Sequence, residues 1–533
     1  MTGRGLSGLA VLSCGLFCLA ACQSIAAEET LPAATIIAGG TVFDGTGSAG
    51  EATDIAIVDG RIAYVGPAAA ARYTHGETVD AAGLVVAPGF IDPHTHAGSD
   101  LASSNSERRA NLAFAYQGVT TVVVGNDGGG RPDIAAQADA ARAKGIGTNV
   151  AYLAGLGPIR ETALGKENRA PTADELDTMK RSLRGAMCEG AWGFSTGLYY
   201  VPQNYADTEE VIALARIAGA LGGYYDTHMR DESTYNITVT GALNEAIDIG
   251  RRADIPVHIA HIKALGPAVW GHSGKMIEAI EAAQAEGLRV TADQYPWTAS
   301  GTRVSNALVP RAALEGGLEK LRERLSDARL RAEIRNGMIA GLERRGGADK
   351  LLVTGHLGGA EVEIGRTLAE IAAGQGVEPV DAALAILEQG DARVASFNMN
   401  AGDIAAFAAR DWVVTGSDGS NGHPRKYGSF PKAYRDLVVD GDMALARFIR
   451  RSSGQTADII GLEDRGYLKP GYAADIVVFD PAAFAPRATY REPGELSAGV
   501  RYLFVNGQAV IVDGDYTGAL PGAPLLKQAD CGS

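Results

Sequence analysis

The middle of the chain alternates short apolar runs with stretches of helical periodicity. Eight of the runs have the length of buried strands, and they cover residues 89–96, 120–125, 148–155, 192–197, 222–228, 255–261, 289–296 and 412–418. Strands that alternate with helices are typical of βα units around a parallel sheet. Because eight units close a (β/α)8 barrel, we predict such a barrel over residues 89–464. Two further runs, 351–356 and 392–398, are assigned to an insertion and its return.

The two ends of the chain carry a different pattern. Residues 35–88 and 465–525 consist of short β-like pieces separated by glycine turns, with Asn506-Gly507 as a hairpin signal in the second segment. We expect both segments to build one small β-sandwich domain. A charged helical segment at about 305–350 lies between the seventh and eighth barrel strands, where it predicts a small subdomain or lid.

Residues 1–22 are typical of a lipoprotein signal peptide. Arg4 precedes an apolar run that is too short and too early for a spanning helix. The run ends in Leu19-Ala20-Ala21-Cys22, which resembles a bacterial lipobox with Cys22 as the lipidated residue. Cleavage after Ala26-Ala27 is the alternative. Under both interpretations, the protein is expected to be exported to the periplasm or cell envelope. Membrane contact is expected only through the anchor at Cys22.

Composition and cysteine content narrow the functional class. A formal net charge of -15 argues against a nucleic-acid binder, which needs a basic surface. Three of the five cysteines lie in the predicted signal, and only Cys188 and Cys531 remain in the mature chain. An exported protein can form a disulfide, but the spacing does not require one. We expect both cysteines to be unpaired and without a catalytic role.

Polar residues gather where the predicted strands end. In a (β/α)8 barrel these ends face the active site, and residues two apart on a strand share a face. The candidate ligands are His94, His96, Asp127, His228, His261 and Asp418. Asp127 alone, within GNDGGG, would be read as a turn former. Convergence at five strand ends instead predicts a site for one or two divalent ions, with zinc as the expected metal. His258, three residues before His261, is expected to face the opposite side.

Several longer stretches resemble a known family. PGFIDPHTHAGSD resembles the opening metal motif of the amidohydrolase superfamily. GAWGFSTGLYYVPQNYADTEEVIALA, GGYYDTHMRDES, DQYPWTASGT and GSDGSNGHPRKYGSFPK resemble the D-aminoacylase (N-acyl-D-amino-acid deacylase) family, over about residues 36–520. The resemblance implies a barrel with a β-sandwich, zinc, and hydrolysis of an amide that releases a free D-amino acid.

The resemblance also implies roles for single residues. The four histidines match the family's metal ligands, and Asp418 matches the carboxylate that touches metal and moves the proton. Lys263, Tyr295 and Arg425 match positions that hold the substrate's α-carboxylate. The chain departs from the family at Asp127, where the relatives usually carry cysteine. A carboxylate is a harder ligand than a thiolate, and we predict that Asp127 bridges two metal ions.

The chemistry of this residue set favours an enzyme. A bound divalent ion activates water and polarises an amide carbonyl, while a nearby carboxylate such as Asp418 can carry the proton to the leaving amine. The leading interpretation is therefore a hydrolase of N-acyl-D-amino acids, acting on a small molecule. A dipeptidase or cyclic-amide hydrolase acting on peptides that contain D-amino acids is the nearest alternative. A binding lipoprotein without catalysis is the more distant one.

Overall fold

The computed structural model describes Met1 and residues 31–532. The predicted signal segment that follows Met1, with Cys22, lies outside the described residues. Within the described part of the chain, no helix combines the length and apolar content that crossing a bilayer requires.

Eight parallel strands form the central barrel. In chain order they are β6 (Phe90–Asp92), β7 (Val119–Val124), β8 (Asn149–Gly155), β9 (Gly193–Gly197), β10 (Tyr224–His228), β11 (Val257–Ile259), β12 (Val290–Gln294) and β16 (Val413–Thr415). The first and last strands meet just beyond their ends, where Thr95 bridges Gly419 and the amide of Asp418 donates to the carbonyl of His94 at 2.9 Å. The (β/α)8 barrel predicted from the sequence is confirmed.

Helices follow the strands and cover the outside of the barrel. They are α2 (Gly98–Leu101), α3 (Ser106–Arg109), α4 (Leu112–Ala115), α5 (Ile134–Lys144), α6 (Leu156–Leu164), α7 (Ala173–Cys188), η1 (Gln203–Tyr205), α8 (Thr208–Ala220), α9 (Thr238–Ala253), η2 (Pro267–Val269), α10 (Ser273–Ala285), α16 (Ala401–Ala408), α17 (Arg425–Tyr434), η5 (Arg435–Val439), α18 (Leu445–Ser452) and α19 (Gly454–Ile460). The strands are buried on both faces because the helices cover the outside and side chains fill the inside; all six residues of β7 are buried. Local signals start several helices, such as the capping box of Thr172 and Glu175 at α7.

A second sheet of nine strands joins the two ends of the chain. Its strands are β1 (Leu31–Val42), β2 (Glu51–Val58), β3 (Arg61–Gly66), β4 (Tyr73–Asp80), β5 (Val85–Pro88), β17 (Ile476–Phe479), β18 (Val500–Val505), β19 (Gln508–Val512) and β20 (Asp515–Tyr516), with the short helix α1 (Ala69–Arg72) before β4. Both faces of β17 are buried. Ile476 and Val478 pack in a core shared with β1, β2 and β3, while Phe479 packs against Phe90 of the barrel, with ring centroids 6.4 Å apart.

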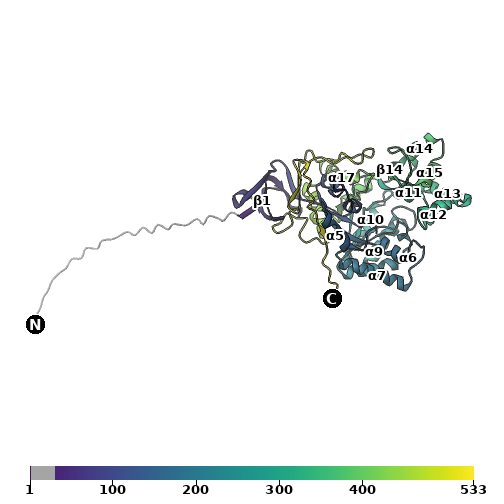
Figure 1. Ribbon diagram of the computed structural model, residues 1–533, viewed down its shortest axis with the longest axis horizontal. Helices are drawn as coiled ribbons and strands as arrows, with labels where there is room; N and C mark the ends of the chain where they lie inside the picture. Colours follow the sequence, from purple (N-terminus) through teal and green to yellow (C-terminus); the bar gives the residue numbers. More distant parts are fainter. Residues whose placement is uncertain (2–30, 533) are drawn as a thin grey trace.

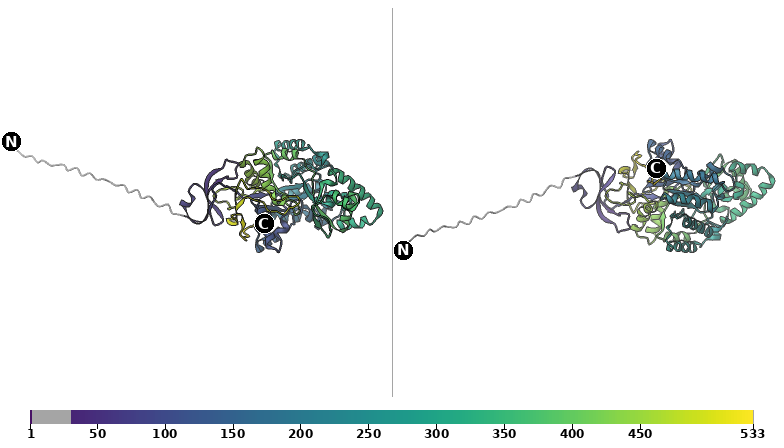
Figure 2. Two further views of the ribbon diagram at one scale, coloured as in Figure 1. Left: turned by 90° about the horizontal axis from the view of Figure 1, so that it is seen from above. Right: turned by 90° about the horizontal axis from the view of Figure 1, so that it is seen from below.

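An inserted unit separates β12 from β16. It contains β13 (Ser300–Arg303), α11 (Val304–Leu308), η3 (Arg311–Leu314), α12 (Leu318–Leu325), α13 (Ala328–Arg344), η4 (Ala348–Lys350), β14 (Leu351–Leu357), α14 (Leu368–Gln375), α15 (Pro379–Gln389) and β15 (Asp391–Ser396). The strands make an antiparallel sheet in the order β13-β15-β14, and the unit has its own apolar core. Figures 1 and 2 show this unit at the end of the molecule opposite β1, with the barrel between them.

The expectation that Cys188 and Cys531 stay unpaired is wrong. The two residues form a disulfide between the end of α7 and the C-terminal segment, with Cα atoms 5.8 Å apart. The C-terminal segment returns along the barrel because β21 (Pro524–Leu525) pairs in parallel with β8, and the amide of Lys527 donates to the carbonyl of Gly190 at 3.0 Å. The pairing depends on this long-range return, which sequence spacing does not reveal.

We expect the disulfide to stabilise the folded chain. It joins residues that lie 343 positions apart, so it restricts the unfolded ensemble strongly, and removing such a bond typically costs about 2–4 kcal/mol. Cys188→Ser should therefore lower the midpoint of thermal denaturation under oxidising conditions. Cys531→Ser should have the same effect, and the double variant should add nothing further. A wild-type midpoint that does not respond to reductant would contradict the expectation.

Candidate active site

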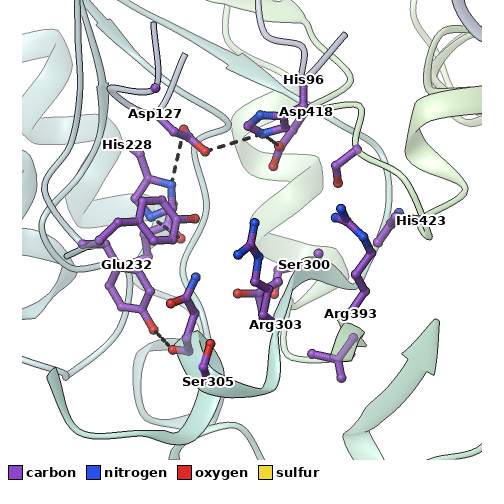
Figure 3. A pocket seen from close by; sticks show the side chains of 18 of the residues that line it. His96, Asp127, His228, Glu232, Ser300, Arg303, Ser305, Arg393, Asp418 and His423 are labelled. Atoms are coloured by element: carbon purple, nitrogen blue, oxygen red, sulfur yellow. Dashed lines mark hydrogen bonds and ion pairs between the residues drawn. The ribbon is translucent and has the colours of Figure 1, made fainter. Parts of the chain in front are cut away.

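A cavity of about 710 Å³ opens at the carboxyl ends of the barrel strands, and the inserted unit forms its far wall (Figure 3). The barrel contributes His96, Asp127, His228, Lys263, Asp418 and Arg425, and the inserted unit contributes Ser300, Arg303, Ser305, Arg345 and Arg393. Four of the six predicted ligands line the barrel side of this cavity, and the buried His94 and His261 lie directly behind them, next to Asp127. The six arrive from five different strand ends, as the strand-end pattern predicts.

The first group of potential ligands contains His94, His96, Asp127 and Asp418, whose nearest ligand atoms lie within 4.8 Å of one another. His94 Nε2 lies 3.4 Å from Asp127 Oδ1. His96 Nε2 lies 3.1 Å from Asp418 Oδ1 and 3.6 Å from Asp127 Oδ2. The group thus combines two imidazoles and two carboxylates, a donor set that suits zinc and similar divalent ions.

The second group contains Asp127, His228 and His261. Asp127 Oδ1 lies 3.6 Å from His228 Nδ1 and 3.3 Å from His261 Nε2, and those two ring nitrogens are 2.9 Å apart. Asp127 therefore belongs to both groups. His258 belongs to neither of the groups found among the described residues; its ring contacts Thr291 and Asp293 instead.

Three of the potential ligands have left-handed backbone conformations. The φ angles are 55° for Asp127, 37° for His261 and 49° for Asp418. Such conformations cost about 1–3 kcal/mol each and persist only where the surroundings fix them. The amide of His261 donates to Asp293 Oδ1 at 2.9 Å, and the strand closure fixes the amide of Asp418. Backbone strain is therefore concentrated at the ends of the strands that carry the potential ligands.

The glycines after Asp127 let its loop approach the rest of the barrel closely. At Gly128, where φ is +67°, a Cβ would collide with the side chain of Gln203. At Gly130 a Cβ would collide with the carbonyl of Leu153 on β8. Gln203 Nε2 in turn donates to the carbonyl of Asp127 at 3.0 Å. The glycine run thus forms the turn that the sequence suggests, and this turn holds Asp127 within the cluster.

The electrostatics suit a cation at this cluster. Burial lowers the pKa of His94 to about 4, so its imidazole is neutral at pH 7. Burial alone would raise the pKa of Asp127, but the neighbouring His94 and His228 hold that pKa well below its usual range. Metal ligation requires neutral imidazole and ionised carboxylate. His94 is fully buried, and neither ring nitrogen has a hydrogen-bond partner among the described residues. The residues therefore fit a divalent ion.

Glu232 is a buried member of the site that the sequence analysis missed. Its Oε1 lies 2.7 Å from Lys263 Nζ and 3.3 Å from His261 Nδ1, and its Oε2 lies 3.6 Å from His228 Nε2. Burial opposes its ionisation, but His228 and Lys263 hold its pKa below the ordinary value. A carboxylate behind two imidazoles fixes their orientation. The available signal was its position four residues after the strand-end His228, in the motif HMRDE.

The three residues predicted to bind the substrate's α-carboxylate differ in their burial and in the partners that they already have. Lys263 lines the cavity, and its ammonium is already paired with Glu232. Arg425 lines the cavity with Nη1 2.6 Å from Asp418 Oδ2, and its Nε has no hydrogen-bond partner in the described part of the chain. Tyr295 is buried, and its ring centroid lies 5.7 Å from Lys263 Nζ and 5.0 Å from the Arg425 guanidinium carbon. Within the described residues its hydroxyl also has no partner.

Together, the barrel and its cluster of histidines and carboxylates define a hydrolase of the (β/α)8 class. The model of the amidohydrolase family matches residues 77–511. The chain therefore belongs to the amidohydrolase family.

Comparisons with individual proteins confirm the predicted D-aminoacylase branch. D-aminoacylase from Alcaligenes xylosoxydans xylosoxydans is 34% identical over 531 residues, covering 94% of this chain and 99% of the relative. The crystal structure of N-acyl-D-glutamate deacylase from Bordetella bronchiseptica, complexed with zinc and a phosphonate inhibitor, is 31% identical, with a TM-score of 0.77. A D-aminoacylase structure that concerns a binuclear metal centre is 33% identical, also with a TM-score of 0.77. Both structures cover 93% of this chain and are covered completely by it.

Proposed function

We propose that this chain is a metal-dependent hydrolase that cleaves the amide bond of N-acyl-D-amino acids and releases the free D-amino acid and a carboxylate. The observation that carries the proposal is the pair of potential ligand groups that share Asp127 at the cavity floor. The relatives support the substrate class, since they are a D-aminoacylase and an N-acyl-D-glutamate deacylase, the latter complexed with zinc and a mimic of the reaction's tetrahedral intermediate.

The two groups would hold one or two divalent ions, and zinc is the proposed metal. His94, His96 and Asp418 would serve one position, His228 and His261 the other, and Asp127 both. When bound, such an ion polarises the scissile carbonyl and activates water. The D-aminoacylase structure that is 33% identical to this chain concerns a binuclear metal centre with one-metal activation and second-metal attenuation.

Asp418 is the proposed proton carrier. Burial would raise its pKa, but Arg425 and His261 hold the pKa well below the ordinary value, so the carboxylate is ionised at neutral pH. Its Oδ1 faces His96 and its Oδ2 faces Arg425. An ionised carboxylate in this position can accept a proton from water and deliver it to the leaving nitrogen.

Arg425 and Tyr295 are the proposed contacts of the substrate's α-carboxylate. Arg425 retains an unpartnered Nε among the described residues, and guanidinium forks bind carboxylates in two-point geometry. The buried hydroxyl of Tyr295 offers a further donor beneath the same guanidinium. Lys263 contributes positive charge next to them, although its pairing with Glu232 reduces what it offers to a substrate.

We further propose that the chain is exported and anchored through a lipidated Cys22. The lipobox-like sequence before Cys22 supports anchoring, and the disulfide of Cys188 and Cys531 suits an oxidising compartment. In cell fractionation, the wild-type chain should remain with membranes, and Cys22→Ser should move it to the soluble exported fraction. Recovery of the wild-type chain with cytoplasmic markers would contradict the proposal.

Removing the metal should abolish activity. The chelator-treated chain should not hydrolyse N-acetyl-D-amino acids, zinc should restore hydrolysis, and N-acetyl-L-amino acids should react poorly under both conditions. Asp418→Asn should lower kcat about 100-fold or more, since it removes a proton-transfer group. The exposed Asp442 provides a matched control, because Asp442→Asn should leave kcat unchanged. Full activity in the chelated chain or in Asp418→Asn would contradict the proposal.

Arg425→Gln should separate carboxylate binding from the effect of Arg425 on Asp418. Because a hydrogen bond to a charged group contributes about 1.5–3 kcal/mol, kcat/KM for N-acetyl-D-amino acids should fall about 10- to 100-fold more than kcat/KM for the corresponding neutral α-carboxamides. The measurement is steady-state kinetics on both substrate series. Equal losses on both would mean that Arg425 acts only through Asp418.

A further inference from the structure

Two arginines of the inserted unit line the cavity from opposite strands. Arg303 on β13 and Arg393 on β15 are directly opposite each other in the antiparallel register. Figure 3 shows both side chains extending from their strands into the cavity, toward the side where Asp418 and His96 lie. The inserted unit thus presents two guanidinium groups to the space above the barrel.

Placing these two guanidinium groups opposite each other is electrostatically unfavourable when no anion lies between them. Like charges that face each other across a strand pair destabilise it, and burial together with Arg303 lowers the pKa of Arg393. Neither guanidinium group has a hydrogen bond or ion pair with any described residue. Asp391 attracts Arg393 through space, but its carboxylate accepts hydrogen bonds from the hydroxyl of Ser305 at 2.5 Å and the amide of Ala392 at 2.8 Å and not from the Arg393 guanidinium. An external anion would relieve this repulsion.

Two glycines lie against the Arg393 side chain, where a larger residue would crowd it. Gly422 lies in the loop between Asp418 and Arg425, and a Cβ at Gly422 would come within 3.2 Å of the Arg393 side chain. Gly422 has φ +80°, which glycine adopts without strain. Gly355 on β14 is equally close, with a Cβ-to-side-chain distance of 3.3 Å. Arg393 therefore lies at the contact between the inserted unit and the loop that carries the proposed catalytic residues.

Two positive groups lie near β13, Arg425 of α17 beside Gly301 and Arg303 at the end of the strand. A Cβ at Gly301 would lie 2.9 Å from Arg425 Nη2, so Gly301 marks where this strand approaches the proposed α-carboxylate contact. Arg303 is two residues further on and shares the face of Gly301, at a spacing of about 7 Å along the strand. Positive charge thus lies at two separate places along the strand, and an acidic amino acid carries two separate carboxylates that guanidinium groups can bind.

We propose that Arg303 and Arg393 form a second anion subsite, which binds a negatively charged side chain of the substrate. The preferred substrates are then N-acyl-D-amino acids with acidic side chains, held by Arg425 at the α-carboxylate and by the arginine pair at the side chain. Two guanidinium forks offer the paired donors that a carboxylate accepts. This inference rests on the proposed deacylase function and specifies its substrate.

The test compares N-acetyl-D-glutamate with N-acetyl-D-glutamine, which has nearly the same size and no side-chain charge. The zinc-loaded wild-type chain should prefer glutamate by at least about 10-fold in kcat/KM, since 1.4 kcal/mol of added interaction corresponds to a tenfold change. Arg303→Gln and Arg393→Gln should each reduce this preference, and the double variant should abolish it because kcat/KM falls far more for the glutamate substrate than for the glutamine substrate. Arg329→Gln is the matched control, because Arg329 lies on α13 of the same unit, is exposed, and does not line the cavity.

Each outcome identifies the claim that fails. Equal use of both substrates by the wild-type chain, or equal losses on both in the variants, would overturn the subsite and leave the deacylase function intact. Hydrolysis of neither substrate by the zinc-loaded chain would overturn the proposed function. The subsite then still has a direct test in calorimetric titration with glutarate, a dianion. Glutarate should bind the wild-type chain and Arg329→Gln more tightly than the double variant, and equal or undetectable binding would overturn the subsite.

Discussion

The site depends on one carboxylate, that of Asp127, which contacts the histidines of both potential ligand groups. His94 and His96 arrive from the end of β6, whereas His228 and His261 arrive from the ends of β10 and β11. Asp127 lies within 3.6 Å of all four. Imidazole nitrogens arranged around one ionised carboxylate provide the donor set that a divalent ion binds. The rest of the barrel keeps Asp127 in this position.

The β domain, the barrel and the inserted unit each contribute differently to the site. The β domain packs on the barrel floor through aromatic contacts such as that between Phe90 and Phe479. The barrel supplies the histidines and carboxylates, and the strain at their left-handed backbone positions is balanced by contacts such as the one between His261 and Asp293. The inserted unit supplies positive charge from the opposite wall of the cavity. Chemistry and substrate selection thus come from different parts of the chain.

Much of this arrangement follows from local sequence pattern. Alternation of apolar strands and helices identifies all eight barrel strands, and the topology of a closed parallel barrel places their polar ends together. Contacts between residues that are far apart in the chain cannot be predicted from this local pattern. Glu232 meets Lys263 only because two loops converge, and Arg303 meets Arg393 only through the pairing of β13 with β15. The disulfide of Cys188 depends in the same way on the return of the C-terminal segment.

The claim that Asp127 serves both ligand groups is tested most directly by crystallography of the zinc-loaded chain, with anomalous diffraction at the zinc edge. The proposed function predicts zinc at the cluster, with the Asp127 carboxylate in contact with every ion bound there. With Asp127→Ala, the anomalous signal at the cluster should weaken or vanish while the barrel strands remain in place. Zinc bound at full occupancy in Asp127→Ala, or bound in the wild-type chain away from Asp127, would contradict the central role of this carboxylate.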